Sequence, residues 1–131
     1  EFGKGVVIEP YLQTVVVAGG LLKRAGSQAQ RDETLAGVIG GEVICGFAYA
    51  EPKGRFNLAD LTTTARKEGA GFVLNGHKAV ALGAPMATHL VVTARTSGGQ
   101  RDAGGVSIFL IPKASKGVTT RDYPTVDGLR A

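Results

Sequence analysis

The sequence predicts a mainly β fold, a barrel or orthogonal sandwich of about seven strands, preceded by two helices. Apolar residues of the segment 11–39 recur at spacings of three and four, which is the period of a helix. After Glu42 the chain changes to runs of about five to nine residues rich in Val, Thr, Ile and Phe, divided by Gly, Pro and Asn, as is typical of strands. At 131 residues the chain is long enough for one ordinary domain and short for two.

The first helix is expected to begin at Pro10, because proline suits a first turn in which its missing N–H would be unpaired. Gly26 is expected to end this helix. Ser27 is then a candidate N-cap for a shorter second helix that ends at Gly40 and Gly41. The residues expected on the apolar faces are Tyr11, Val15, Ala18, Leu22 and Ala25 in the first helix and Leu35, Val38 and Ile39 in the second.

Two turns are expected to organise the strands. The segment 67–70 predicts a tight hairpin, and Asn75-Gly76 is the strongest short-range turn signal, suited to a type I′ hairpin. The polar, Gly-rich segment 97–104 is expected to be a flexible hairpin tip at the surface. The expected strands are 43–50, 61–67, 71–74, 77–81, 89–95, 105–111 and 118–123.

Composition excludes some classes of protein. Apolar residues make up 44% and charged residues 20% of the chain, which argues against global disorder. Fifteen Lys and Arg against eleven Asp and Glu give a net charge of +4. Two interpretations of this surplus stay open: solvated faces with a slight basic bias, or attraction of an anionic ligand such as a nucleotide or CoA. Nucleic-acid binding is not expected, because the basic residues are scattered and aromatic residues are few.

Cys45 is the only cysteine, so neither a disulfide within the chain nor a cysteine-based metal site is possible. A reducing compartment is therefore expected. The apolar run 15–22 is too short to cross a bilayer, and no signal peptide opens the chain. We therefore expect a soluble, cytoplasmic protein that does not enter a membrane.

No catalytic or metal-binding constellation is complete within the sequence. His77 and His89 have no carboxylate at a spacing that suits zinc, so structural or surface roles are expected for both. The glycine-rich segment 37–41 does not follow a predicted strand, and neither a dinucleotide-binding nor a P-loop pattern occurs. Glu51-Pro52, taken alone, marks the end of a strand.

A set of short segments, taken together, resembles the acyl-CoA dehydrogenase family. The segments occur in the family's order over nearly the whole chain, and the spacing from the Glu-Pro pair to the Asn-Gly pair needs no gap. They are 26–31 (GSQAQR) with Leu35 and Gly41-Glu42, then 47–52 (FAYAEP), 75–78 (NGHK), 87–95, 106–111, 116–118 and 126–128.

The resemblance implies a subunit of three domains, helical, β-barrel and helical, that binds FAD, forms dimers or tetramers and passes electrons to a partner. Residues 1–41 would be the end of the N-terminal helical domain, and residues 42–131 the central, acyl-CoA dehydrogenase-like middle-domain β-barrel, with its last strand truncated. The reaction implied is the α,β-dehydrogenation of an acyl-CoA thioester to a trans-2-enoyl-CoA. The family's catalytic base is a Glu of the C-terminal helical domain, so no catalytic residue is expected in this chain, and the isolated fragment is predicted to be inactive.

The resemblance also implies binding residues. Phe56 and Asn57 stand at the positions that meet the acyl-CoA substrate. Ala50 replaces a flavin-contacting Thr, and a Trp-Ile-Thr is replaced by Val80-Ala81-Leu82, so main-chain donors remain while side-chain contacts are lost. The residues expected along the flavin are Phe47, Tyr49, Ala50, Val80, Ala81 and Leu82.

Two hypotheses follow from these departures. In the first, the parent protein is an FAD-dependent acyl-CoA dehydrogenase with a variant flavin pocket. In the second, it is a non-catalytic, flavin-poor partner subunit of an acyl-CoA dehydrogenase-like hetero-oligomer. An acyl-CoA-binding module, or an oxidase or monooxygenase of the same fold, remains as a third possibility.

Overall fold

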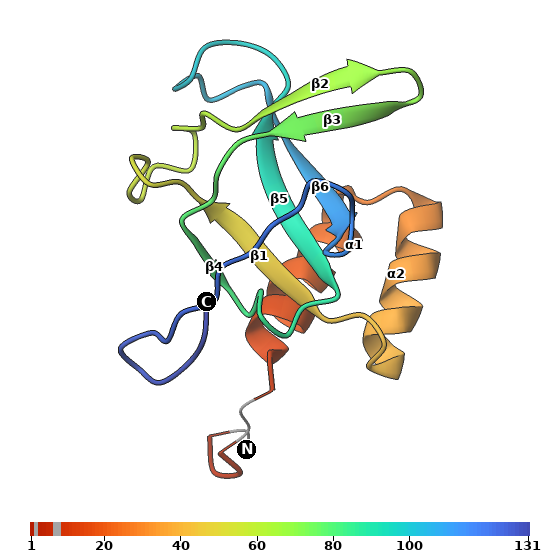
Figure 1. Cartoon of the computed structure of the whole chain (residues 1–131). Helices are drawn as coiled ribbons and strands as arrows, with labels where there is room; N and C mark the ends of the chain where they lie inside the picture. Colours follow the sequence, from red (N-terminus) through yellow and green to blue (C-terminus); the bar gives the residue numbers. More distant parts are fainter. Residues whose placement is uncertain (2, 7–8) are drawn as a thin grey trace.

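The computed structural model describes residues 1, 3–6 and 9–131, and it has helices on one face of a six-stranded sheet (Figure 1). None of the helices in these ranges is long and apolar enough to cross a membrane. In chain order the elements are η1 (Leu12–Gly19), α1 (Gly20–Ala25), α2 (Gln28–Gly40), β1 (Cys45–Ala50), β2 (Thr64–Glu68), β3 (Gly71–Asn75), β4 (Val80–Leu82), β5 (His89–Arg95) and β6 (Val106–Pro112).

The first helix is present, but its winding differs from the expected one. Its first eight residues, η1, form a π-helix, in which hydrogen bonds reach one residue further than in an α-helix. The face that it presents to the sheet therefore shifts relative to the α-helical pattern. Ala18 and Leu22 are buried as expected, Thr14 joins them, and Tyr11, Val15 and Ala25 are exposed, contrary to the prediction.

The second helix confirms the predicted start and end. Ser27 Oγ accepts a hydrogen bond from Gln30 N at 3.2 Å, and Gln30 Oε1 accepts one from Ser27 N at 2.9 Å, which makes a capping box. Gly41 ends α2 in the left-handed conformation, with φ of 78°. Ile39, which was expected on the apolar face, is 87% exposed.

The sheet has the order β3-β2-β5-β1-β4, and β6 pairs with β5. β5 is its centre, because it runs parallel to β1 from the pair Cys45 and His89 and antiparallel to all of β6. The rings of Phe72 in β3 and Phe109 in β6 meet edge to face with centroids 5.2 Å apart, so the sheet curls, although it does not close into a barrel.

Residues 118–123, expected to be the seventh strand, form no strand. Only the first and last residue of this segment are large and apolar, so it lacks the alternating pattern that would bind it to a sheet. It instead crosses the sheet as an extended connection, the dark blue trace of Figure 1, and Tyr123 pairs with Ala131 through two main-chain hydrogen bonds.

One of the two predicted hairpins is confirmed. β2 and β3 are joined by Gly69 and Ala70, and Gly69 has a positive φ of 59°. The predicted hairpin at Asn75-Gly76 is wrong, because β4 pairs with β1 and not with β3. Gly76 is needed for close approach instead: a Cβ on it would lie 2.6 Å from Thr63 Cα.

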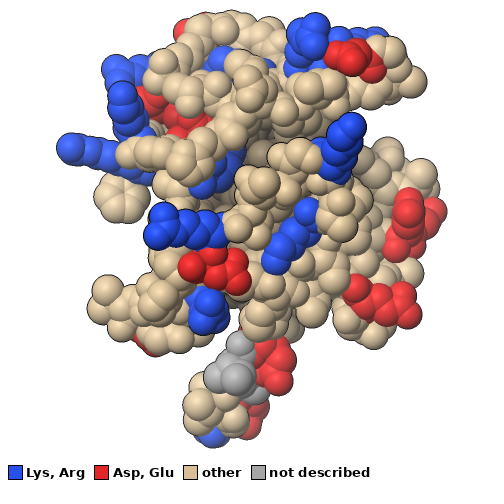
Figure 2. All heavy atoms as spheres, viewed as in Figure 1, with Lys and Arg blue, Asp and Glu red and all other residues tan. Residues whose placement is uncertain are grey.

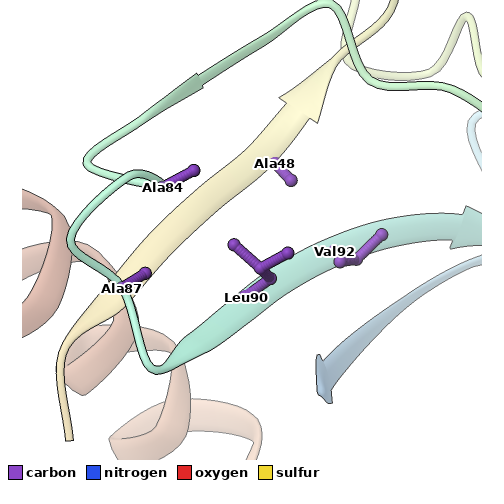
Figure 3. Close-up of a cluster of buried hydrophobic side chains, with 5 residues drawn as sticks. All are labelled: Ala48, Ala84, Ala87, Leu90 and Val92. Carbon is purple, nitrogen blue, oxygen red and sulfur yellow. The ribbon is translucent and has the colours of Figure 1, made fainter. Parts of the chain in front are cut away.

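The core consists of two clusters, one on each face of the sheet. Between the helices and the sheet lie Ala18, Cys45 and Val91. Thr14 Oγ1 joins this cluster to β1, since it accepts a hydrogen bond from Cys45 N at 3.0 Å and contacts Cys45 O at 3.3 Å. The second cluster is made largely of alanine, which lets the segment after β4 pack closely on β1 and β5; Figure 3 shows its members, Ala48, Ala84, Ala87, Leu90 and Val92.

Candidate functional site

The strands β1 and β4 form an apolar surface that contains most of the residues expected along a flavin. Phe47 pairs directly with Leu82, and Ala50 pairs with Val80, with a register shift on β1 between the two pairs. The rings of Phe47 and Tyr49 stack with centroids 4.9 Å apart and planes 29° apart. Val80 and Leu82 keep about two fifths of their surface exposed. We call Phe47, Tyr49, Ala50, Val80 and Leu82 the β1–β4 surface.

Ala81 is the predicted flavin residue that lies elsewhere. It alternates with its neighbours along β4, and its side chain packs against the alanine-rich cluster on the opposite side of the sheet. Only its main chain is available to a ligand on the β1–β4 surface. β4 is also the last strand in the sheet order, so its outer edge carries main-chain groups that the sheet does not use.

A buried ion pair lies where β1 ends. Lys78 Nζ is 2.8 Å from Glu51 Oε1, and the two side chains are 10% and 3% exposed. Lys78 Nζ also contacts Thr93 Oγ1 at 3.3 Å and Tyr49 O at 3.5 Å. Beside it, Ala79 N donates to Ala50 O at 2.8 Å. Lys78 therefore ties the segment before β4 to both β1 and β5.

The Glu51 carboxylate accepts further hydrogen bonds from Thr62 and Thr63, which follow the loop 52–60. Thr62 N donates to Oε2 at 2.7 Å, the Thr62 hydroxyl donates to the same oxygen, and Thr63 N donates to Oε1 at 3.0 Å. We call Glu51, Lys78, Thr62 and Thr63 the polar anchor. Every carboxylate oxygen is satisfied, which is the condition under which burying a charge is tolerated.

The polar anchor shifts the titration of both charged groups. Burial raises the pKa of Glu51, but the hydrogen bonds from Lys78, Thr62 and Thr63 outweigh it and lower this pKa to about 2. Burial lowers the pKa of the Lys78 ammonium, and the Glu51 carboxylate partly opposes that shift. With its pKa lowered to about 2 and both oxygens held by donors, the Glu51 carboxylate is ionised at neutral pH and only weakly basic, which suits a structural role.

The predicted substrate residues lie apart from the β1–β4 surface, on the loop that follows Glu51. Phe56 is 98% exposed, and Asn57 is exposed while its Oδ1 accepts a hydrogen bond from Ala59 N at 3.0 Å. The loop 52–60 also carries Lys53 and Arg55. In Figure 2 basic side chains gather at the left, over this loop, and acidic side chains at the right, over α2.

Sequence reasoning gave no role to several residues that the structure makes central. Lys78 belongs to the NGHK segment, but no role followed from that position alone. Thr62 and Thr63 had no signal at all, because only the fold brings them to Glu51. A cavity of about 720 Å³ was likewise not foreseen: it lies over the alanine-rich face, beneath residues 117–123.

Comparisons with known proteins agree with this geometry. The chain is 31% identical over 117 residues to the acyl-CoA dehydrogenase FadE29 of Mycobacterium tuberculosis (strain ATCC 25618 / H37Rv), over 89% of this chain and 30% of that protein. The steroid ACAD Tcur3481-Tcur3483 superposes with a TM-score of 0.83 at 29% identity, over 93% of this chain and 34% of that one. The FAD complex of PigA superposes with a TM-score of 0.70 at 29% identity, over 76% of this chain and 26% of that one.

The chain thus spans about a third or less of the proteins that it resembles. Within that span the match is continuous, because the family described as "Acyl-CoA dehydrogenase, middle domain" matches residues 46–131, from β1 to the last residue. The order of short motifs and the superposed strands point to the same family. This chain belongs to the acyl-CoA dehydrogenase family, and its β-rich part is that family's middle domain.

Proposed function

We propose that the protein of which this chain forms part is an FAD-dependent acyl-CoA dehydrogenase. It would convert an acyl-CoA thioester to a trans-2-enoyl-CoA and pass the electrons to a separate acceptor. The observation that carries the proposal is the β1–β4 surface, an apolar face that includes the last strand of the sheet order, in a chain of this family. This chain would supply the wall against which flavin and thioester lie.

The residues present fit a flavin in part. A flat ring system packs well against apolar and aromatic side chains, and Phe47, Tyr49 and Leu82 offer such a face. The ring also needs hydrogen-bond partners, and the side chains of Ala50, Val80 and Leu82 have none. The main chain at the outer edge of β4 would have to provide them.

Bound FAD supplies the acceptor for hydride. The residues of this chain would orient the ring, keep water from its inner face and aim main-chain N–H groups at atoms that become more negative as hydride arrives. The polar anchor would hold β1 and β4 at the spacing that this requires, because Lys78 contacts both Glu51 and Tyr49. We place substrate contacts on Phe56 and Asn57 of the loop 52–60.

A second candidate is a flavin-poor partner subunit in a hetero-oligomer. The specific observation in its favour is that Ala50, Val80 and Leu82 of the β1–β4 surface, which replace Thr, Trp and Thr in the pattern that the family resemblance implies, carry no hydrogen-bonding side chain. Each hydrogen bond lost to a ligand costs on the order of 0.5–1.5 kcal/mol. The similarity to the steroid ACAD named for two proteins, Tcur3481 and Tcur3483, supports an assembly of unlike subunits.

Purification of the full-length protein alone separates the two candidates. The dehydrogenase proposal expects a yellow flavin absorption band that bleaches when an acyl-CoA is added under anaerobic conditions. If the purified protein lacks this band and takes up no added FAD, the dehydrogenase proposal fails and the partner-subunit proposal is supported. If the protein carries stoichiometric flavin that bleaches on adding an acyl-CoA, the partner-subunit proposal fails. The isolated chain is expected to turn over no acyl-CoA. A cytoplasmic location remains a prediction, because the single cysteine indicates a reducing compartment.

A further inference from the structure

Arg95, at the end of β5, is a buried cation whose acceptors are all main-chain carbonyls. It is 7% exposed. Its Nη1 donates to Gly104 O at 2.8 Å and contacts Ser97 O at 3.4 Å. Its Nη2 donates to Ala59 O at 2.6 Å, with Gln100 O and Asp102 O each at 3.1 Å. One guanidinium thereby connects two loops, 52–60 and 96–105.

The same two loops are joined by bonds that do not involve Arg95. Leu61 N donates to Gln100 O at 3.1 Å, and Gln100 Nε2 donates to Asp60 Oδ1 at 2.5 Å. Arg101 Nε donates to Asp60 Oδ2 at 2.9 Å. The loop 96–105 is therefore a brace against the end of the loop 52–60, although its sequence indicated only a flexible hairpin tip.

The other end of the loop 52–60 is fixed by the polar anchor through Glu51. The two fixed ends are also linked to each other, because Arg95 N donates to Thr63 O at 2.8 Å. Between them the loop is folded by its own main chain, with Gly54 N bonded to Glu51 O at 3.1 Å and Asn57 N bonded to Gly54 O at 3.0 Å. The exposed tip is thus held in one shape although its side chains face solvent.

From this geometry we propose that Arg95 is a positioning residue for the loop 52–60, and so for the substrate contacts of Phe56 and Asn57. The role of the loop rests on the function proposed above, whereas the action of Arg95 on the loop does not. Arginine suits the task because its planar fork directs several N–H groups at once. A lysine has three donors that radiate from one nitrogen on a flexible stem, so it cannot reproduce the contacts that two separate guanidinium nitrogens make to five carbonyls.

Hydrogen exchange of this chain tests the action on the loop. In the Arg95→Lys variant we expect exchange at the Leu61 and Asn57 amides to rise on the order of tenfold, because the bonds that close the loop open more often. Amides between β5 and β6, such as Val92 and Phe109, should keep their protection. The matched control is Arg66→Lys, since Arg66 forms an exposed ion pair with Glu68 and should change neither set.

Unchanged exchange at Leu61 and Asn57 overturns the proposal, as does an equal rise at every amide, which would make Arg95 a residue of global stability only. If the Arg95→Lys variant does not fold, Arg95→Gln, which keeps one planar NH₂ group, takes its place. It should raise exchange at Leu61 and Asn57 with β5 and β6 unchanged, and no rise overturns the proposal.

The full-length protein provides the functional readout. There Arg95→Lys should raise KM for the acyl-CoA severalfold, with flavin content unchanged and kcat altered less. A fall in kcat with KM unchanged overturns the positioning role. A wild-type protein without flavin or activity refutes the proposed function instead, and the exchange result, which needs neither flavin nor thioester, still decides the role of Arg95.

Discussion

The polar anchor begins at Glu51, directly after the last residue of β1, and so adjoins the β1–β4 surface, yet the two are built in opposite ways. In the polar anchor, each charge is buried and each carboxylate oxygen has a donor. The β1–β4 surface is partly exposed, and its side chains offer apolar contact without hydrogen-bonding groups at Ala50, Val80 and Leu82. The difference teaches that the buried charges that shape this region are paired within the chain, while the residues that would touch a flavin differ from the pattern that the family resemblance implies.

The largest expected effect is in the polar anchor. Lys78→Met leaves the Glu51 carboxylate buried without its cation, which typically costs about 3–5 kcal/mol in the free energy of unfolding. Urea denaturation followed by circular dichroism measures it. Arg66→Met, which breaks an exposed ion pair, is the control and should cost less than about 1 kcal/mol. Equal losses in the two variants would show that the buried ion pair of the polar anchor contributes no more to stability than an exposed one.

Acid should weaken the polar anchor specifically. The folded-state pKa of Glu51 is about 2, below its ordinary value of 4.5, so its stabilisation is present above pH 4.5 and is lost as the pH falls towards 2. The difference corresponds to about 3 kcal/mol. Between pH 5 and pH 2, the stability of Glu51→Gln should therefore fall less than that of the unchanged chain. Parallel pH profiles, measured by thermal melts, would mean that Glu51 is not the group that titrates.

The close approach of Gly76 to Thr63 should contribute less to the free energy of unfolding than the charges of the polar anchor. In Gly76→Ala the new Cβ would lie 2.6 Å from Thr63 Cα, and the main chain would have to shift at a cost of about 1–3 kcal/mol. Gly104→Ala is the matched control, because nothing lies within 4 Å of its Cβ position. Denaturant midpoints of the two variants should differ; coincident midpoints would show that the segment at Gly76 yields easily.

The smallest effect on stability, and the most informative on function, is expected at the β1–β4 surface. Ala50→Thr combined with Leu82→Thr places hydroxyls where the family resemblance expects them, on partly exposed positions, so unfolding should change by less than about 1 kcal/mol. In the full-length protein, two new hydrogen bonds should tighten FAD binding by about tenfold. Fluorescence titration with FAD measures it, and an unchanged Kd would place the flavin away from these residues.

Local patterns predicted part of this structure because they depend on neighbours in sequence. The cap at Ser27, the glycine that ends α2 and the hairpin at Gly69 each follow from one or two residues and their backbone preferences. The strand β5, which ends at Arg95, was predicted because its residues are rich in apolar side chains. The family motif also located the strand that ends at Ala50, just before Glu51, although not the partners of the Glu51 carboxylate.

The misses arose where contacts distant in sequence decide the outcome. The π-winding of η1 changes which residues face the sheet, so a three-and-four spacing misplaced Tyr11 and Val15. Gly76 had the signature of a turn, but its real constraint is the approach of Thr63. Arg95 had no signal, because its five acceptors come from two loops whose positions only the fold sets.

The single thiol of the chain lies at 0% exposure where η1 meets β1, and its burial raises the thiol pKa. A thiol reagent in solution can reach Cys45 only after the helix has moved off the strand. The rate of labelling therefore counts openings of this one interface, and a change in that rate on adding FAD or an acyl-CoA would report ligand binding without any chromophore in the ligand.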